Sequence, residues 1–171
     1  SGNNPDVSLS AAVRVVEPLL PITFAMEMVE ADLEQAKETM GATGDRDQVT
    51  IFGRTMSWRD ADRVMEDGVL LREALEAKCI SGAMLHRLQI VGLLFREYMD
   101  TKSVAALRYR PLWRYLLARW DEDGNAKKAA AKVPQLVKWL HDLIDNDESL
   151  RTLPESVRFA LMSRAAEEDA E

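Results

Sequence analysis

Apolar residues change their spacing about a third of the way along the chain. Before residue 57 the pattern predicts a strand over 8–16, an amphipathic helix over 22–40 and a short buried strand over 49–52. In the helix, apolar residues recur every three or four positions and acidic residues occupy much of the other side. Two strands do not form a stable sheet alone in water, so we expect this part to pack against further strands or another chain.

After residue 57 the apolar spacing is helical throughout. Ser57 and Ser81 are typical N-cap residues, and Asp67-Gly68 predicts a break or kink in the helix that Ser57 begins. The predicted helices cover 58–78, 82–99, 103–120, 126–144 and 154–166. Pro111 should interrupt or restart its helix, and Pro134 should kink the helix that contains it. Pro154 should begin the last helix.

These patterns predict a mainly α protein. A short strand–helix–strand part, residues 1–56, should be followed by a bundle of about five helices, residues 57–171. With 47% apolar and 30% charged residues, the chain has the composition of a globular protein with a core.

The charge is unevenly distributed along the chain. Residues 1–80 hold 8 Lys and Arg against 15 Asp and Glu, and residues 139–171 hold 3 against 9. Residues 81–138 hold 11 against 5, which makes a positive block inside a chain of net charge −7. Such a block is a candidate surface for a polyanion, although solvated helix faces also account for it.

The cysteine count and the hydropathy pattern exclude several classes. The single cysteine, Cys79, excludes an internal disulfide and a zinc site with several thiolates. No apolar run reaches the roughly 18–20 residues that span a bilayer, and the first residues do not form a signal peptide. We therefore expect a cytoplasmic protein without a membrane partner.

Three sequence blocks follow one another in a recognisable order. They read VTIFG (49–53) ahead of Trp58, ISGAMLHRL (80–88) and LRYRPLWRY (107–115). In this order and spacing they resemble the C-terminal end of the large subunit of type III CRISPR effector complexes. The first residues, NPDVSLSAAV (4–13), resemble the closing strand of that family's polymerase- or cyclase-type palm domain, which is followed by a helix ending in LEQAK (33–37).

The resemblance implies a scaffolding role in antiviral defence. Residues 1–56 would be a palm remnant, and residues 57–171 would be the helical C-terminal domain that packs beside the small subunits. The implied partners are other effector subunits, including the small helical ones, together with guide RNA and target RNA. ATP and a divalent metal serve the complete palm, so we expect no cofactor in this chain.

We expect no catalysis by this chain alone. The palm's Gly-Gly-Asp-Asp turn is absent, and the chain contains no adjacent glycines. The carboxylates of 121–123 are interpreted as an exposed turn. His141-Asp142 spells the dyad of the family's nuclease domain, but a metal site needs more ligands, and His86 lies 55 residues away. We interpret the dyad as structural.

Two groups of residues are candidate contacts. Within the resemblance, Lys37 matches the lysine that contacts nucleotide phosphates in palm cyclases, and Ser10 would lie on the adjoining strand. The second group would contact RNA or a partner subunit, because arginine pairs bidentately with phosphate and the neighbouring aromatic residues can support RNA contacts. Its members are Arg108, Arg110, Arg114, Arg119, Lys127, Lys128 and Lys132.

Two alternatives remain. The chain could be a separately produced small helical subunit that lines the filament of an effector complex, although such a subunit does not need a strand–helix–strand lead-in. It could also be one half of a split palm that makes cyclic oligoadenylates from ATP when joined to its other half.

Overall fold

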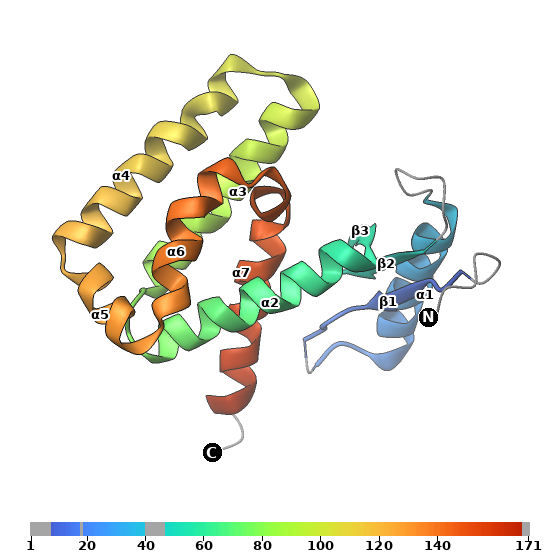
Figure 1. Cartoon of the computed structure of the whole chain (residues 1–171). Helices are drawn as coiled ribbons and strands as arrows, with labels where there is room; N and C mark the ends of the chain where they lie inside the picture. Colours follow the sequence, from blue (N-terminus) through green and yellow to red (C-terminus); the bar gives the residue numbers. More distant parts are fainter. Residues whose placement is uncertain (1–7, 18, 40–46, 169–171) are drawn as a thin grey trace. The chain divides into compact units, whose positions relative to one another are not determined.

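The protein is mainly α-helical, as predicted. The computed structural model describes residues 8–17, 19–39 and 47–168, and the chain divides into two compact units, residues 1–62 and 63–171 (Figure 1). We call them the small unit and the helical unit. The boundary between them falls inside one helix, α2 (Trp58–Glu76).

The small unit is a three-stranded sheet with one helix. Its elements are β1 (Ala11–Val13), α1 (Ile22–Glu38), β2 (Gln48–Ile51) and β3 (Arg54–Ser57). The strand order is β1-β2-β3. β1 and β2 are parallel, with Ala11 opposite Val49, so α1 is the crossover connection between them. The predicted strand–helix–strand order is confirmed, although β1 is much shorter than residues 8–16.

The third strand is missing from the sequence prediction. β3 pairs with β2 in an antiparallel hairpin in which Ile51 lies opposite Arg54. Phe52 and Gly53 form the two-residue turn with φ of 55° and 77°, and two positive φ values suit the twist of a hairpin. Part of the expected additional sheet is therefore supplied by the chain itself. The last residue of the helix predicted over 22–40 lies outside the described residues.

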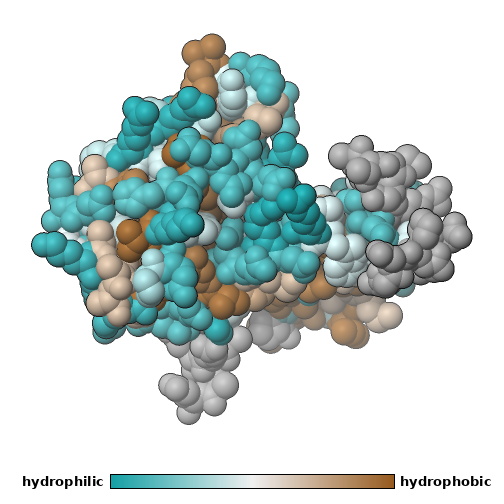
Figure 2. All heavy atoms as spheres, in the orientation of Figure 1, coloured by the Kyte–Doolittle hydropathy of each residue, from teal (hydrophilic) through white to brown (hydrophobic). Residues whose placement is uncertain are grey.

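α1 carries more apolar surface than this sheet covers. Its buried stripe is narrow and consists of Ala25, Asp32 and Ala36. Larger apolar side chains of the helix stay exposed, and so do those beside β1. In Figure 2 such residues reach the surface of the small unit as brown spheres. The exposed members are Leu9, Val13, Val15, Leu19, Ile22, Phe24, Met26 and Met28.

The helical unit has a continuous apolar core. Its further elements are α3 (Gly82–Thr101), the 3₁₀-helix η1 (Val104–Arg108), α4 (Tyr109–Glu122), α5 (Asn125–Lys132), α6 (Pro134–Asp142), the 3₁₀-helix η2 (Leu143–Asp145) and α7 (Asp147–Glu168). α3 lies beside both α7 and α4. Fully buried side chains from these helices meet in one cluster, among them Leu85, Phe95, Trp113, Leu140 and Leu153. The visible face of the unit is largely hydrophilic (Figure 2).

Both predicted N-caps are present. The Ser57 hydroxyl accepts a hydrogen bond from the backbone N–H of Asp60 at 3.1 Å. The Ser81 hydroxyl accepts one from the N–H of Met84 at 3.2 Å. Each hydroxyl satisfies an N–H group that the first helical turn leaves without an intrahelical acceptor.

Gly68 does not break its helix, so of the two predicted outcomes the break is wrong. α2 continues from Trp58 to Glu76. A Cβ atom at Gly68 would lie 2.6 Å from Cδ1 of Phe159. The glycine therefore serves the close approach of α2 and α7, at a cost of roughly 1 kcal/mol in helix propensity.

The three prolines behave differently from one another. Pro111 lies in the first turn of α4, so the helix restarts there as predicted. Pro134 begins α6, where the predicted single helix is divided in two at Val133. The prediction for Pro154 is wrong, because α7 begins at Asp147 and contains this proline. The Pro154 ring lies against Gly92 of α3, where a Cβ atom would come within 2.6 Å of its Cδ.

Candidate anion-binding surface and cavity

The candidate arginines of η1 and α4 face solvent because of the way α4 packs. Tyr109, Trp113, Leu116 and Trp120 recur every three or four residues and are buried. The Tyr109 ring also meets Phe95 of α3 edge to face, with 5.4 Å between ring centroids. This apolar stripe fixes the rotation of α4, so the residues on its other side face solvent. Arg108, Arg110, Arg114 and Arg119 are all exposed.

Tyrosine hydroxyl groups, and not carboxylates, orient two of these arginines. Nε of Arg110 donates to the Tyr109 hydroxyl at 3.1 Å, and its guanidinium lies 5.8 Å from the ring centroid. Arg119 donates to the Tyr115 hydroxyl at 3.3 Å. These hydrogen bonds raise the pKa of both guanidinium groups above the ordinary value for arginine. The arginines therefore keep their full charge and retain donors for an anion.

None of the four arginines forms an ion pair with a residue in the described part of the chain. Other arginines of the protein do: Arg63 pairs with Glu148, and Arg96 with Glu155. No carboxylate in the described part of the chain pairs directly with the α4 arginines, although Asp145 lies near enough to act on Arg110 and Asp123 near enough to act on Arg119. Guanidinium groups in this state can form two parallel hydrogen bonds to a phosphate.

The arginines do not form a single row. Arg110 and Arg114 are four residues apart and share one side of the exposed face, and Tyr115 and Arg119 share another. The structure therefore places Arg119 apart from the pair that sequence spacing grouped with it.

The lysines of α5 also differ from one another. Lys127 and Lys132 are exposed. Lys128 is half-buried and donates from Nζ to the backbone carbonyl of Lys78 at 2.6 Å. Its ammonium group therefore helps to hold the end of α2, and Lys127 and Lys132 are more available for a contact with RNA or a partner.

The two predicted nucleotide contacts lie in the small unit. Lys37 is exposed near the end of α1, and its ammonium lies 2.7 Å from the carboxylate of Glu34. Ser10 is half-buried directly before β1. Their role toward nucleotide stays a prediction.

The described histidines and carboxylates do not come together as a metal site. His86 on α3 and His141 on α6 are both exposed. Across the residues that the structure describes, no group of three His, Cys, Asp or Glu side chains could hold a metal ion. The carboxylates of 121–123 end α4 and are exposed. No described helix is both long enough and apolar enough to cross a membrane.

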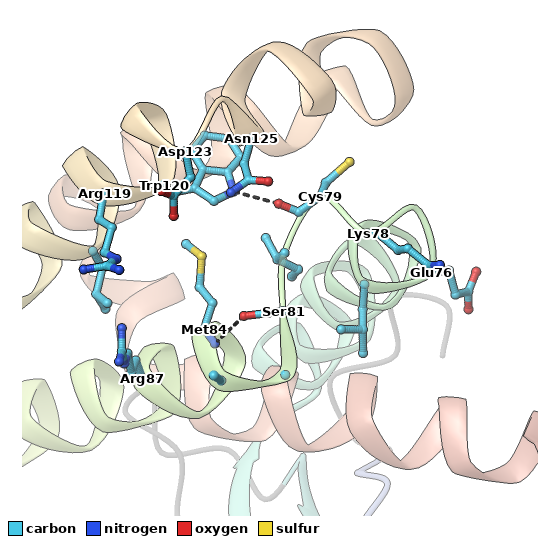
Figure 3. A pocket seen from close by; sticks show the side chains of 15 residues that line it. Glu76, Lys78, Cys79, Ser81, Met84, Arg87, Arg119, Trp120, Asp123 and Asn125 are labelled. Atoms are coloured by element: carbon cyan, nitrogen blue, oxygen red, sulfur yellow. Dashed lines mark hydrogen bonds between the residues drawn. The ribbon is translucent and has the colours of Figure 1, made fainter.

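Sequence reasoning missed a cavity of about 750 Å³ in the helical unit. It lies between the end of α2, the first turn of α3 and the last turns of α4 (Figure 3). Arg87 and Arg119 stand on one side of it, on facing helices, while Lys78 and Glu76 lie on the other side. Arg87 belongs to a recognised block, but nothing in the spacing indicates that it lies near Arg119.

The walls of this cavity are held by hydrogen bonds. The Trp120 indole N–H donates to the Cys79 carbonyl at 2.8 Å. Lys78 has a φ of 56° and turns the chain out of α2. The ammonium group of Lys128 donates a hydrogen bond to the backbone carbonyl of Lys78. The Ser81 cap then starts α3. These contacts tie the turn between α2 and α3 to α4 and α5.

Comparison with protein-family models, with curated proteins and with solved structures finds no match to this chain. The candidate site is therefore interpreted from its own geometry and from the resemblance in sequence.

Proposed function

We propose that this chain is the C-terminal part of the large subunit of a type III CRISPR effector complex. In this role it scaffolds the assembly and contacts the backbone of the guide–target RNA. The observation that carries the proposal is the set of exposed arginines on η1 and α4, which form no ion pair with a described residue. Two of the three resembling sequence blocks also lie in the helical unit: residues 80–88 contain the start of α3, and residues 107–115 contain the start of α4.

The small unit supports the same proposal from its apolar surface. Residues such as Phe24 and Met26 on α1 and Val15 after β1 are more than half exposed. A sheet of three short strands with exposed apolar neighbours is expected of a remnant that packs against the rest of a larger domain. The split-palm alternative draws on this same observation, and it differs in requiring a nucleotide at Lys37.

Backbone contact is the appropriate mode of RNA recognition for this surface. Arginines that lie along a helix and project into solvent can bind phosphates without reading bases. In an RNA-guided complex, base pairing carries the sequence information, and the protein holds the duplex by its backbone. Each phosphate that is neutralised releases counterions, so such binding weakens as salt rises.

The test is RNA binding by the assembled complex. The triple variant Arg108→Ala/Arg110→Ala/Arg114→Ala should bind target RNA more weakly. The slope of log affinity against log salt should become shallower by about 1 for each phosphate contact that is lost. Lys138→Ala, which removes one exposed cation from α6, is the control. Unchanged affinity and slope in the triple variant would contradict the proposal.

A further inference from the structure

We propose that the cavity between α3 and α4 binds a short segment of a partner protein in which an aliphatic side chain adjoins a carboxylate. The proposal does not depend on RNA binding, because the cavity shares only Arg119 with the candidate RNA surface. Arg87 and Arg119 line the cavity, and Arg110 and Arg114 do not.

The apolar lining of the cavity suits an aliphatic group. It includes Ile80, Met84 and Leu116, which are 5%, 9% and 4% exposed, so a guest would contact only their outermost atoms. The aromatic residue Trp120 also lines the cavity, is 3% exposed and already donates its indole N–H to the Cys79 carbonyl. A nucleobase would therefore find no open aromatic face on which to stack.

The charges around the cavity select a single carboxylate. The guanidinium groups of Arg87 and Arg119 lie on the same side of it (Figure 3). Arg87 has no partner among the described residues, and Arg119 is bonded to the neutral Tyr115 hydroxyl. Two guanidinium groups suit a planar carboxylate. Lys78, Glu76 and Asp123 also line the cavity, and the two carboxylates would repel the closely spaced charges of a polyanion such as RNA.

The size and rigidity of the cavity suit a short peptide. Its volume of about 750 Å³ lies within the range that binding pockets show. Its walls are already held by the bonds from Trp120 and Lys128 to the turn at Lys78 and Cys79. A guest would therefore bind with little cost for ordering the protein.

The probe is a fluorescently labelled hexapeptide of glycine and serine that carries one leucine next to one aspartate and has an amidated C-terminus. Fluorescence anisotropy with the whole chain measures its binding. Arg87→Ala and Arg119→Ala should each weaken binding by about fivefold. Gly82→Phe should block the cavity, and it should fold because a Cβ atom at Gly82 meets no heavy atom within 4 Å. Circular dichroism checks the folding of each variant.

Matched controls separate this site from the RNA surface. Arg110→Ala/Arg114→Ala removes two exposed charges of α4 that lie outside the cavity, and it should leave peptide binding unchanged. The same peptide with asparagine in place of aspartate should bind at least about fivefold more weakly.

Several results would overturn the proposal. These are failure of the aspartate peptide to bind, equal binding of the asparagine peptide, or equal losses in the cavity variants and the control. Displacement of the peptide by single-stranded RNA, with RNA binding that is itself lost in Arg87→Ala, would assign the cavity to RNA instead. None of these results bears on the triple variant, so failure here is distinguishable from failure of the proposed function.

Discussion

The two units of this chain distribute apolar and charged side chains in opposite ways. In the helical unit, large apolar residues such as Trp113 are buried, and the α4 arginines face solvent without an ion pair to a described residue. In the small unit, Phe24 and Met26 are exposed, and Arg14 is bonded to the buried Asp32. The difference indicates that the helical unit supplies its own core and keeps these charged side chains on its surface. The small unit lacks part of its apolar cover.

The largest expected effect comes from separating the two units. Residues 57–171, which keep α2 and its cap, should unfold cooperatively with a midpoint within about 5 °C of the whole chain. Residues 1–56 should not fold alone, because so small a unit buries too little apolar surface. Thermal unfolding followed by circular dichroism tests both fragments. A cooperative transition in monomeric 1–56 would show that its exposed apolar residues need no partner.

A smaller effect is expected from the ion pair of the small unit. Nε and one terminal nitrogen of Arg14 each donate to Asp32 at 2.7 Å, and this bonding raises the pKa of the guanidinium. Arg14→Ala would leave a buried carboxylate without its cation. Because Arg14 is partly exposed, we expect a loss of about 2 kcal/mol in the opening free energy of the small unit.

Hydrogen exchange of residues 48–57 measures this opening. Arg14→Lys is the matched control, since lysine keeps the charge but not the two parallel hydrogen bonds, and it should lose less than alanine does. Equal exchange in Arg14→Ala and the unchanged protein would mean that the pair does not hold the unit together.

The smallest effect concerns the buried aspartate of the helical unit, which has no such cation bonded to it. Asp67 is 8% exposed, and Oδ1 accepts from the Trp139 indole N–H at 2.6 Å, while Oδ2 has no hydrogen-bond partner. Burial raises the pKa of Asp67 from 3.8 to about 6, against the opposing effects of Trp139 and Arg63. The ionised side chain is therefore a cost to the folded state.

The sign of the pH dependence follows from this raised pKa. Above about pH 6 both the folded and the unfolded chain carry the charge, and the folded chain bears the full penalty. As the pH falls from 6 toward 4, the folded state takes up the proton first. The penalty for the buried charge is then removed, and the free energy of unfolding rises. Asp67→Asn should raise the free energy of unfolding at pH 7.5 by about 1–2 kcal/mol and have little effect at pH 4.

Urea unfolding at the two pH values measures the difference. Asp142→Asn, which neutralises an exposed aspartate, is the control. A destabilising effect of Asp67→Asn at pH 7.5 would show that the carboxylate is worth more to the Trp139 hydrogen bond than its burial costs.

Features that depend on neighbours in the chain could be predicted from the sequence. The start of α1, both serine caps and the restart of α4 at Pro111 follow from side chains within one or two helical turns. The exposure of Arg108, Arg110 and Arg114 follows from the buried stripe on α4 in the same way. For these features, the local backbone hydrogen bonds and the apolar spacing are compatible with one structure only.

Features that depend on distant residues were mispredicted or missed. Pro154 continues a helix because Gly92, 62 positions earlier, leaves room for its ring, and Gly68 is required by Phe159. β3 exists because β2 offers it an edge, and Arg87 and Arg119 share a cavity because α3 and α4 pack side by side. Amino-acid order limits what each segment can form. Close packing between segments far apart in the chain selects among those possibilities. The reason is that the space and the charges around one segment are set by side chains from another part of the chain.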